Sequence, residues 1–420
     1  MHDLANEGVV MDAKSTLVIV GGGLAGAKAA EGARGRGFEG QILIVGEEQM
    51  PPYERPPLSK AVLRGEAEPS STQVHDAAYY TDQKVEVITG VSVLKIDLPS
   101  RRLELSDGKG IGYDSLVLTT GAAPRKLKIP GADLDGVHYL RTVDDATKLK
   151  SAIKGTGRVA IIGAGWVGSE VAASARMMGA EVVLIGPELF PLQTVLGEKV
   201  ASVFGQLQSD HGVNLRLGVG VSEIRGAKSV EEILLADGSR ERADVIVVGV
   251  GADPRVELAV AAGLKVDNGI VVDGNLETSA SGVYAAGDVA SAWHPHYKRQ
   301  LRVEHWANAR YQGTAAGENA VGPHQVYDRL PYFYSDQYDV SLEYVGHSES
   351  ADEVVIRGDL EAREFIAFYH HGGVLSAALT VNITKVFKDI KLMIASGKIL
   401  DLAALGDENV PLDSFSAEQA

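Results

Sequence analysis

The 420-residue sequence contains no cysteine, so the protein has no dithiol, no sulfenic acid and no thiolate ligands for an iron–sulfur cluster of its own. It also lacks an apolar stretch of the roughly 20 residues that span a bilayer. The first 15 residues are polar and have no signal-peptide core. We therefore expect a flexible tail over residues 1–15, with Met11 as an alternative start, and a cytoplasmic location.

Basic residues are outnumbered, with 40 Lys and Arg against 56 Asp and Glu and a formal net charge of −16. Because binding to phosphate backbones needs a basic field, this balance argues against nucleic acid as the main partner. Hydrophobic residues make up 45% of the chain, which is enough for two or three domains with sizeable cores.

Glycine is abundant, and it forms two matching motifs, 21–26 and 163–168, each directly after an apolar run. The order of strand, tight turn and helix start makes this pattern a dinucleotide site. The first glycine forms the turn, the second lets the backbone approach a pyrophosphate, and the third packs helix on strand. The predicted contact residues are Gly21, Gly23, Leu24, Ala25, Gly26, Gly163, Gly165, Trp166, Val167 and Gly168.

Two such motifs predict two dinucleotides, of which a flavin and a nicotinamide are the usual pair. Without cysteine, electrons that reach the flavin must leave from the flavin itself. The chain thus reads as α/β, with two Rossmann-like dinucleotide-binding domains and a C-terminal α+β domain. We assign residues 16–124 and 252–330 to an FAD-binding domain, 125–251 to an NAD-binding domain and 331–420 to the C-terminal domain. In that last domain we expect alternating strands and then one helix, over 384–396.

Several segments suit a flavin. Glu47 lies 21 residues after Gly26, where a carboxylate accepts from ribose hydroxyls, although it also fits a solvated turn. The run from Pro52 to Lys60 is rigid and non-helical, and its cations suit an anionic planar cofactor. Taken alone, this run would be interpreted as a structural proline turn with surface cations. Arg55 and Lys60 are its candidate ligands.

Later segments add to the flavin side. A strand ends at 119–121, where the chain crosses between domains, and another ends in Gly-Asp, with the aspartate predicted to accept from ribityl hydroxyls at the start of the next helix. A helix that begins in the block 302–309 is expected to face the flavin pyrimidine carbonyls and to stabilise reduced, anionic flavin. The residues assigned here are Thr120, Gly121, Arg125, Gly287, Asp288, Glu304, His305 and Trp306.

Together these segments resemble the FAD-dependent, NADH-linked ferredoxin reductases of oxygenases and haem monooxygenases, a family similar to rubredoxin reductases and apoptosis-inducing factor. The resemblance runs over about residues 16–412, and Pro52–Lys60 and Arg302–Ala309 are its specific motifs. It implies a glutathione-reductase-like fold and a Lys60 that lies near the flavin ring, paired with Glu170. From its position, Glu170 is expected in the first turn of a helix, where simple capping is the alternative role.

The nicotinamide side shows no arginine after the strand 181–185, where NADP enzymes usually carry one. Gly186 stands where many relatives carry an acid, so Glu188 is the expected ribose ligand, and its charge favours NADH over NADPH. The alternative is that Glu188 points to solvent and both cofactors are tolerated. Trp166 is expected as a lid or stacking partner, or else as a domain-interface core residue. Gly251 belongs to a turn that resembles the family's nicotinamide pocket.

The predicted function is transfer of hydride from NADH to FAD and of single electrons to a [2Fe-2S] ferredoxin. Lys60, Glu170 and Trp166 are the predicted catalytic residues; no nucleophile or general base is needed, because the cofactor carries the chemistry. Rubredoxin reductase, NADH oxidase or small-acceptor reductase, and redox-sensing interaction protein remain alternatives. We expect no metal, because His294 and His296 have no third ligand, and a monomer or weak homodimer.

Docking of the partner is the least determined step, because ferredoxins are usually acidic and so is this chain. Electrostatic attraction of an acidic ferredoxin would need a local basic patch on this chain. The alternatives are that its basic residues are ordinary solvated cations, or that the interface is more apolar. An aromatic stretch over 331–338 resembles the family's segment near the flavin edge. The candidate basic residues are Lys298, Arg299, Lys385, Lys388 and Lys391.

Overall fold

A computed structural model describes residues 14–155, 157–349 and 352–416. Most of the tail expected over residues 1–15 lies outside the described residues. The chain divides into two compact units. Unit 1 comprises residues up to 54, 70–123 and 253–331, and unit 2 comprises 55–69, 124–252 and the residues from 332. The short strands β8 (Ala122–Pro124) and β17 (Ala252–Pro254), where the chain passes between the units, pair with each other.

Unit 1 is built on a parallel sheet with the strand order β19-β7-β1-β2-β3. Four of the five residues of the central strand β1 are buried, as expected for an apolar strand covered on both faces. Two smaller sheets complete the unit, together with helices α3 (Ala77–Asp82) and α7 (Glu257–Ala261). The strands are β1 (Thr16–Val20), β2 (Gln41–Val45), β3 (Val85–Ile88), β7 (Ser115–Leu118), β19 (Val283–Ala285), then β4 (Val93–Asp97), β5 (Arg102–Leu105), β6 (Gly110–Gly112), and β18 (Ile270–Val272), β20 (Ala290–His294), β21 (Arg299–Leu301).

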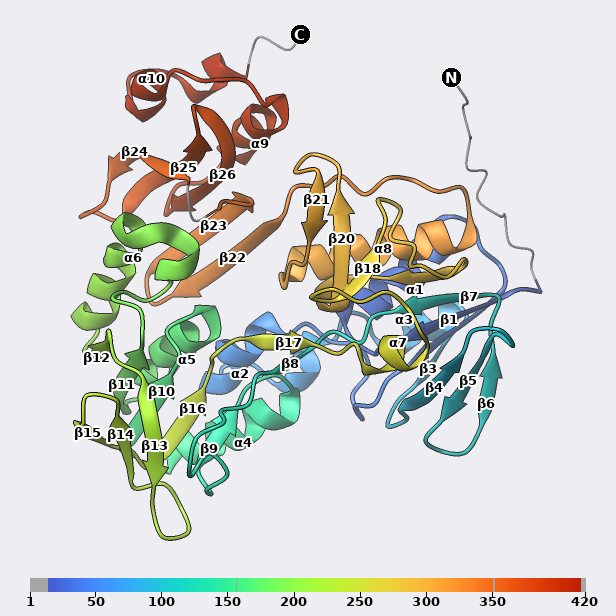
Figure 1. The fold of residues 1–420 in the computed structure, drawn as a ribbon, viewed down its shortest axis with the longest axis horizontal. Coiled ribbons are helices and arrows are strands. Elements are labelled where there is room, and N and C mark those ends of the chain that lie inside the picture. The colour runs from blue at the N-terminus through green and yellow to red at the C-terminus, as the bar shows by residue number, and fades with distance from the viewer. Residues whose placement is uncertain (1–13, 156, 350–351, 417–420) are drawn as a thin grey trace. The chain divides into compact units, whose positions relative to one another are not determined.

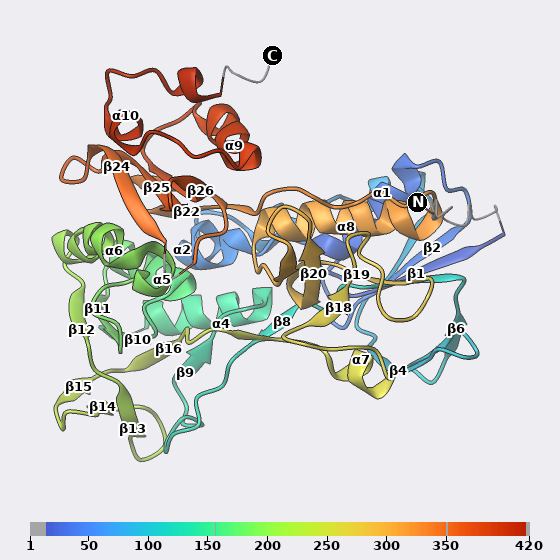
Figure 2. The ribbon, with the colours of Figure 1, turned by 45° about the horizontal axis from the view of Figure 1, so that its top comes forward.

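Helices α1 (Leu24–Gly35) and α8 (Trp306–Val321) lie side by side over this sheet (Figures 1 and 2). Three glycines allow their backbones to touch. A Cβ atom on Gly317 would lie 1.9 Å from the Ala29 carbonyl oxygen, and one on Gly313 would lie 2.4 Å from that of Ala25. A Cβ on Gly32 would similarly meet the Thr314 carbonyl oxygen at 2.2 Å. The two helices therefore pack at the closest distance that backbones permit.

Unit 2 repeats the plan with a parallel sheet of order β12-β11-β10-β16-β9. Its helices are α2 (Ala61–Arg64), α4 (Val143–Lys154), α5 (Trp166–Met177) and α6 (Gln193–Asp210), the last interrupted at Gly197. A three-stranded antiparallel sheet of order β13-β14-β15 lies between β12 and β16 in the chain. The strands are β9 (Val137–Tyr139), β10 (Arg158–Ile162), β11 (Glu181–Gly186), β12 (Asn214–Leu217), β13 (Val221–Arg225), β14 (Glu232–Leu235), β15 (Arg240–Arg242) and β16 (Val245–Val248).

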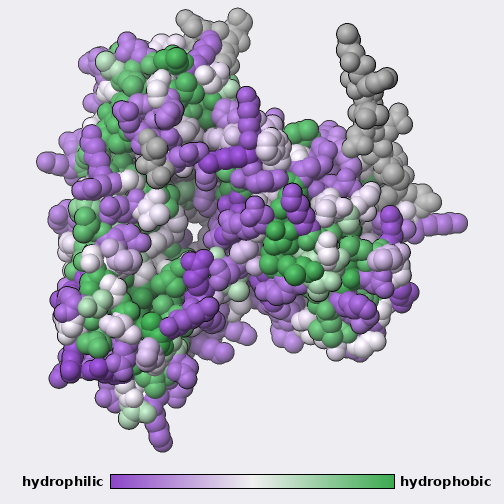
Figure 3. Space-filling model, in the orientation of Figure 1, coloured by the Kyte–Doolittle hydropathy of each residue, from purple (hydrophilic) through white to green (hydrophobic). Residues whose placement is uncertain are grey.

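The C-terminal part of unit 2 is an antiparallel sheet of order β22-β23-β26-β25-β24. Its strands are β22 (Tyr332–Gln337), β23 (Val340–Gly346), β24 (Glu353–Asp359), β25 (Glu364–His371) and β26 (Val374–Val381), followed by helices α9 (Phe387–Ser396) and α10 (Leu402–Gly406). On the face drawn in Figure 3, apolar side chains form small groups between polar ones. In the described part of the chain, no helix combines the length and apolar character needed to cross a membrane.

Two local predictions are wrong. Asp288 lies in a short 3-10 turn that leads into β20, not at the start of an α-helix. The C-terminal sheet is followed by two helices rather than one, and the first starts at Phe387. The helix that we expected to begin in the block 302–309 does so, at Trp306.

The glycine contact between α1 and α8 predicts a large effect of a single methyl group. Gly317→Ala should destabilise the protein by about 1–3 kcal/mol, because the added Cβ meets backbone that cannot move aside. For a domain of this size, the melting temperature should fall by roughly 2–10 °C, which thermal unfolding by circular dichroism measures. Gly35→Ala on α1, where a Cβ meets nothing within 4 Å, is the matched control and should not lower it. Equal melting temperatures for the two variants would contradict this account.

Candidate functional site

Each parallel sheet carries a glycine turn at the carboxyl end of its central strand. In unit 1, Gly21 has a φ of +125°, and a Cβ there would lie 2.2 Å from the Thr119 carbonyl oxygen at the end of β7. In unit 2, Gly163 has a φ of +108°, and its Cβ would lie 2.3 Å from the Gly249 carbonyl oxygen after β16. Both turns therefore require glycine, and both sit where the strand order reverses, which is where open α/β sheets bind ligands.

The third glycine of each motif brings the helix against the strand. A Cβ on Gly26 would lie 2.2 Å from the Gly21 carbonyl oxygen, and one on Gly168 would lie 1.9 Å from that of Gly163. The N-caps of α1 and α5 are Gly23 and Gly165, and neither helix has a side-chain cap or an acidic residue in its first turn. The first N–H groups of these helices are thus oriented for an external acceptor.

Helices α3, α4 and α10 are capped by side chains. Thr142 and Asp145 form a reciprocal capping box on α4, and Asp76 and Asp401 cap α3 and α10. Because α2, α6 and α8 also begin without a side-chain cap or a first-turn acid, it is the glycine turn before the helix that distinguishes α1 and α5. The cradle of small residues and the uncapped termini fit the pyrophosphate of a dinucleotide at both turns.

The other residues of unit 1 that we predicted to bind the flavin follow the ends of its strands. Glu47 follows β2 and forms a bidentate ion pair with Arg255, in which Nη2 and Oε2 are 2.9 Å apart. Arg255 is fixed through its backbone, since its carbonyl accepts from the Thr120 hydroxyl at 2.7 Å and its N–H donates to Gly121. No local pattern indicated Arg255, because its partner Glu47 lies 208 positions away.

At the end of β19, Gly287 has a φ of +79° and donates its N–H to the Gln312 side chain of α8 at 3.0 Å. Asp288 is half-buried beside it, and its carbonyl accepts from Arg302 at 3.4 Å. The Arg302 guanidinium also pairs with Glu304, and His305 occupies the N-cap position of α8 without a side-chain capping hydrogen bond. Trp306, the first residue of α8, lies 5.3 Å from the Arg310 guanidinium in a cation–π contact.

In unit 2, Lys60 and Glu170 form an ion pair with Nζ and Oε1 2.7 Å apart. Their side chains are 14% and 9% exposed, so the pair is largely withdrawn from water. Glu170 lies past the first turn of α5, which corrects the predicted position, and a cap there is excluded because α5 has no acidic residue in its first turn. Two serines, Ser59 and Ser335, donate to the same carboxylate at 2.5 and 2.6 Å.

Other predicted residues of unit 2 have defined neighbours. Arg55 donates to the Arg141 carbonyl at 2.5 Å. Trp166 is half-buried at the start of α5, with its ring edge-to-face against Phe333 at 4.6 Å. Glu188 is half-buried after β11, and the Arg125 N–H donates to Gly251, which has a φ of +103°. Lys388 and Lys391 lie on α9, where the Lys391 ammonium is 5.4 Å from the Tyr332 ring centre.

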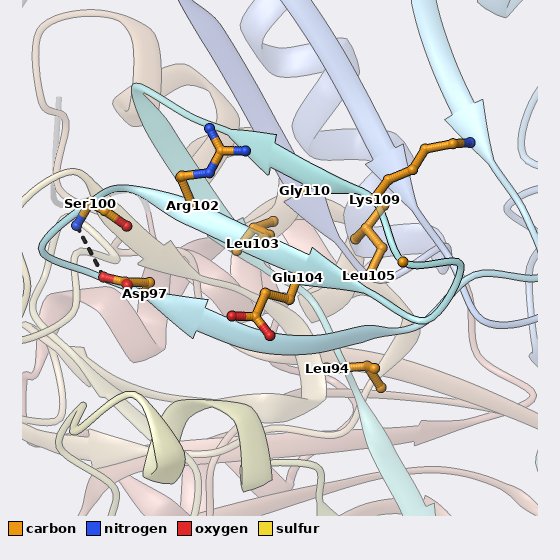
Figure 4. A pocket seen from close by; sticks show the side chains of 10 residues that line it. Leu94, Asp97, Ser100, Arg102, Leu103, Glu104, Leu105, Lys109 and Gly110 are labelled. Atoms are coloured by element: carbon orange, nitrogen blue, oxygen red, sulfur yellow. Dashed lines mark hydrogen bonds between the residues drawn. The ribbon is translucent and has the colours of Figure 1, made fainter.

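One surface pocket in unit 1 is lined by β4, β5 and the turn before β6, with Leu94, Arg102, Glu104 and Lys109 among its side chains (Figure 4). None of the predicted site residues lines it. Its charged side chains belong to exposed positions of the hairpin, so we assign it no role in the chemistry.

A family model described as pyridine nucleotide-disulphide oxidoreductase matches residues 15–313, and one described as reductase C-terminal matches residues 332–416. The chain belongs to the pyridine nucleotide-disulphide oxidoreductase family. As a member it is an oxidoreductase that uses FAD and NAD(H), although it has no cysteine with which to form the redox disulfide of the family's name.

Within this family the chain belongs with the ferredoxin reductases that resemble putidaredoxin reductase. It is 38% identical to rhodocoxin reductase from Rhodococcus erythropolis, with 87% of this chain and 86% of the relative covered. It is 37% identical to the ferredoxin–NAD(+) reductase component of the anthranilate 1,2-dioxygenase system of Burkholderia cepacia, with 95% and 98% covered. The crystal structure of the covalent putidaredoxin reductase–putidaredoxin complex gives a TM-score of 0.93 at 35% identity, covering 97% of this chain and 99% of the other.

The buried ion pair predicts a strong non-additive effect on stability. Lys60→Met or Glu170→Gln alone should each lower stability by about 3–5 kcal/mol, because each leaves one buried charge without its partner. The double variant should lose clearly less than the sum of the two, since both charges are then absent. Melting temperatures of the wild type and the three variants, measured at one pH, provide the cycle. Simple additivity would show that the two charges do not depend on each other.

Proposed function

We propose that this protein takes hydride from NADH and passes single electrons to a [2Fe-2S] ferredoxin that serves an oxygenase or a haem monooxygenase. The observation that carries the proposal is the pair of glycine turns, each at the reversal point of its own parallel sheet. Two dinucleotide sites in a chain without cysteine support an electron path that runs from nicotinamide to flavin and then out of the protein. A cytoplasmic location and a monomer or weak homodimer belong to the same proposal.

FAD, when bound, supplies the conversion of a two-electron hydride donor into a source of single electrons. The residues of this chain bind the two dinucleotides and orient them. The first glycine turn and the N-terminus of α1 hold the FAD pyrophosphate, and Glu47 accepts from the ribose hydroxyls. Lys60 places its ammonium near the flavin ring and is held there by Glu170. The second turn holds the NADH pyrophosphate, with Glu188 on its ribose and Trp166 shielding the nicotinamide from water.

The first experiment is NADH-driven reduction of cytochrome c, with and without an added [2Fe-2S] ferredoxin. We expect strong dependence on the ferredoxin, because the flavin has no internal acceptor to which it can deliver electrons. The same ferredoxin without its cluster is the control. Equal rates without ferredoxin would move the function to a small-acceptor reductase, and no turnover despite bleached flavin would move it to a redox sensor. A rubredoxin in place of the ferredoxin tests the remaining acceptor.

Selection of NADH over NADPH is proposed to rest on Glu188. Glu188→Ala should narrow the ratio of kcat/KM for NADH over NADPH by at least about tenfold, since a carboxylate beside a 2′-phosphate repels it. Steady-state kinetics with both cofactors measure this ratio. Glu181→Ala, which removes an acid that is 79% exposed at the opposite end of the same strand, is the matched control. An unchanged preference in Glu188→Ala would show that another residue holds the ribose.

A further inference from the structure

We propose that Ser335, on the first strand of the C-terminal sheet, is a positioning residue for the Lys60–Glu170 pair. The Glu170 carboxylate accepts two hydrogen bonds, from Ser335 Oγ at 2.6 Å on Oε1 and from Ser59 Oγ at 2.5 Å on Oε2, and its Oε1 forms the ion pair with Lys60 Nζ at 2.7 Å. Glu170 is 8% exposed and Ser335 is 1% exposed, so water does not substitute easily for either hydroxyl.

The three partners constrain the carboxylate in different ways. The terminal torsion of a glutamate is broad and roughly two-fold, so the ammonium alone does not fix the plane of the carboxylate. Ser59 precedes Lys60 directly and moves with it, which leaves Ser335 as the donor that comes from another element. With hydroxyls on both oxygens, the plane is fixed and Oε1 stays directed at Lys60. The positioning of the lysine thus depends on a strand of the C-terminal sheet.

The register of β22 on α5 explains why a serine stands at this point. Alternate residues of β22 are buried, and they lie against α5, whose residues 166 and 170 share one face of the helix. Phe333 packs on Trp166, and Ser335, two positions on, meets Glu170. Figure 1 shows β22 in orange and α5 in green.

The next inward residue of β22 continues the contact. Gln337 Oε1 accepts from Gln208 Nε2 at 2.9 Å, and the same amide donates to the Ser169 carbonyl at 3.2 Å. Ser335 is therefore held between two side chains that are themselves anchored, one by aromatic packing and one by a buried amide pair. Such a support fixes the position of its hydroxyl better than a loop would.

This inference rests on the proposed function, in which Lys60 lies near the flavin ring. Its test compares Ser335→Ala with Ser335→Thr, which keeps the hydroxyl, and with Ser115→Ala. Ser115 is a buried serine of unit 1 whose hydroxyl donates to the Ala320 carbonyl at 2.8 Å, so its variant is a matched loss of a buried hydroxyl. Lys60→Met is the reference for complete loss of the ammonium.

Two measurements are made on each purified full-length holoprotein. Anaerobic stopped-flow absorbance gives the rate of flavin reduction by NADH, and mass spectrometry after brief acetic anhydride treatment gives the extent of Lys60 acetylation. Ser335→Ala should slow flavin reduction on the order of tenfold, the loss expected for one hydrogen bond to a charged group, with FAD content and the KM for NADH unchanged. Lys60 acetylation should rise, because its partner no longer holds it. Ser335→Thr should restore both values, and Ser115→Ala should change neither.

Wild-type values for Ser335→Ala in both measurements would overturn the inference. So would slower flavin reduction without faster Lys60 acetylation, because a positioning residue acts through the lysine. If Ser335→Ala does not fold, Ser335→Cys, which keeps the volume but is a poor donor, takes its place with the same expectations. A wild type whose flavin NADH does not reduce would contradict the proposed function, while the acetylation comparison would still test the role of Ser335.

Discussion

The buried carboxylate of Glu170 joins three separate pieces of chain in unit 2. It accepts hydrogen bonds from Ser59 in the segment 55–69 and from Ser335 in β22, forms an ion pair with Lys60, and is itself part of α5. A charge placed this deep is tolerated only where polar partners replace its lost water, and each partner comes with a segment that must fold around it. The segment 55–69 therefore belongs to unit 2, although it lies within the stretch that we assigned to an FAD-binding domain. The domain boundaries that we assigned from the sequence remain a prediction.

The two glycine turns are subject to the same steric constraint. In each, the chain leaves the central strand so close to the end of the neighbouring strand that a Cβ would overlap a carbonyl oxygen. The helix that follows is brought equally close by the third glycine. Neither helix has a side-chain cap or an acidic residue in its first turn, so its first N–H groups are available to a bound anion.

The sequence predicted the parts of the fold that local pattern controls. Apolar runs followed by glycine turns gave both parallel sheets, and the family resemblance gave the pairing of Lys60 with Glu170, which the structure contains. The block 302–309 contains the start of α8, as predicted, but no pattern showed that Arg302 is fixed by contacts to Asn268 and Glu304. Ser335 and Arg255 were missed because their partners lie 165 and 208 positions away, and no periodicity in a single sequence encodes such distances.

The close backbone contact between α1 and α8 limits how unit 1 can vary in sequence. Across Gly32, Gly313 and Gly317 the two helices meet backbone to backbone, with no layer of side chains between them. Their separation is therefore set by the van der Waals radii of main-chain atoms, which no substitution changes gradually. Side chains elsewhere on the two helices can be exchanged to alter charge or solubility, but the spacing between the first glycine turn and the helix that follows Arg302 has no intermediate values. That spacing is a fixed dimension of the fold, to which the rest of unit 1 must conform.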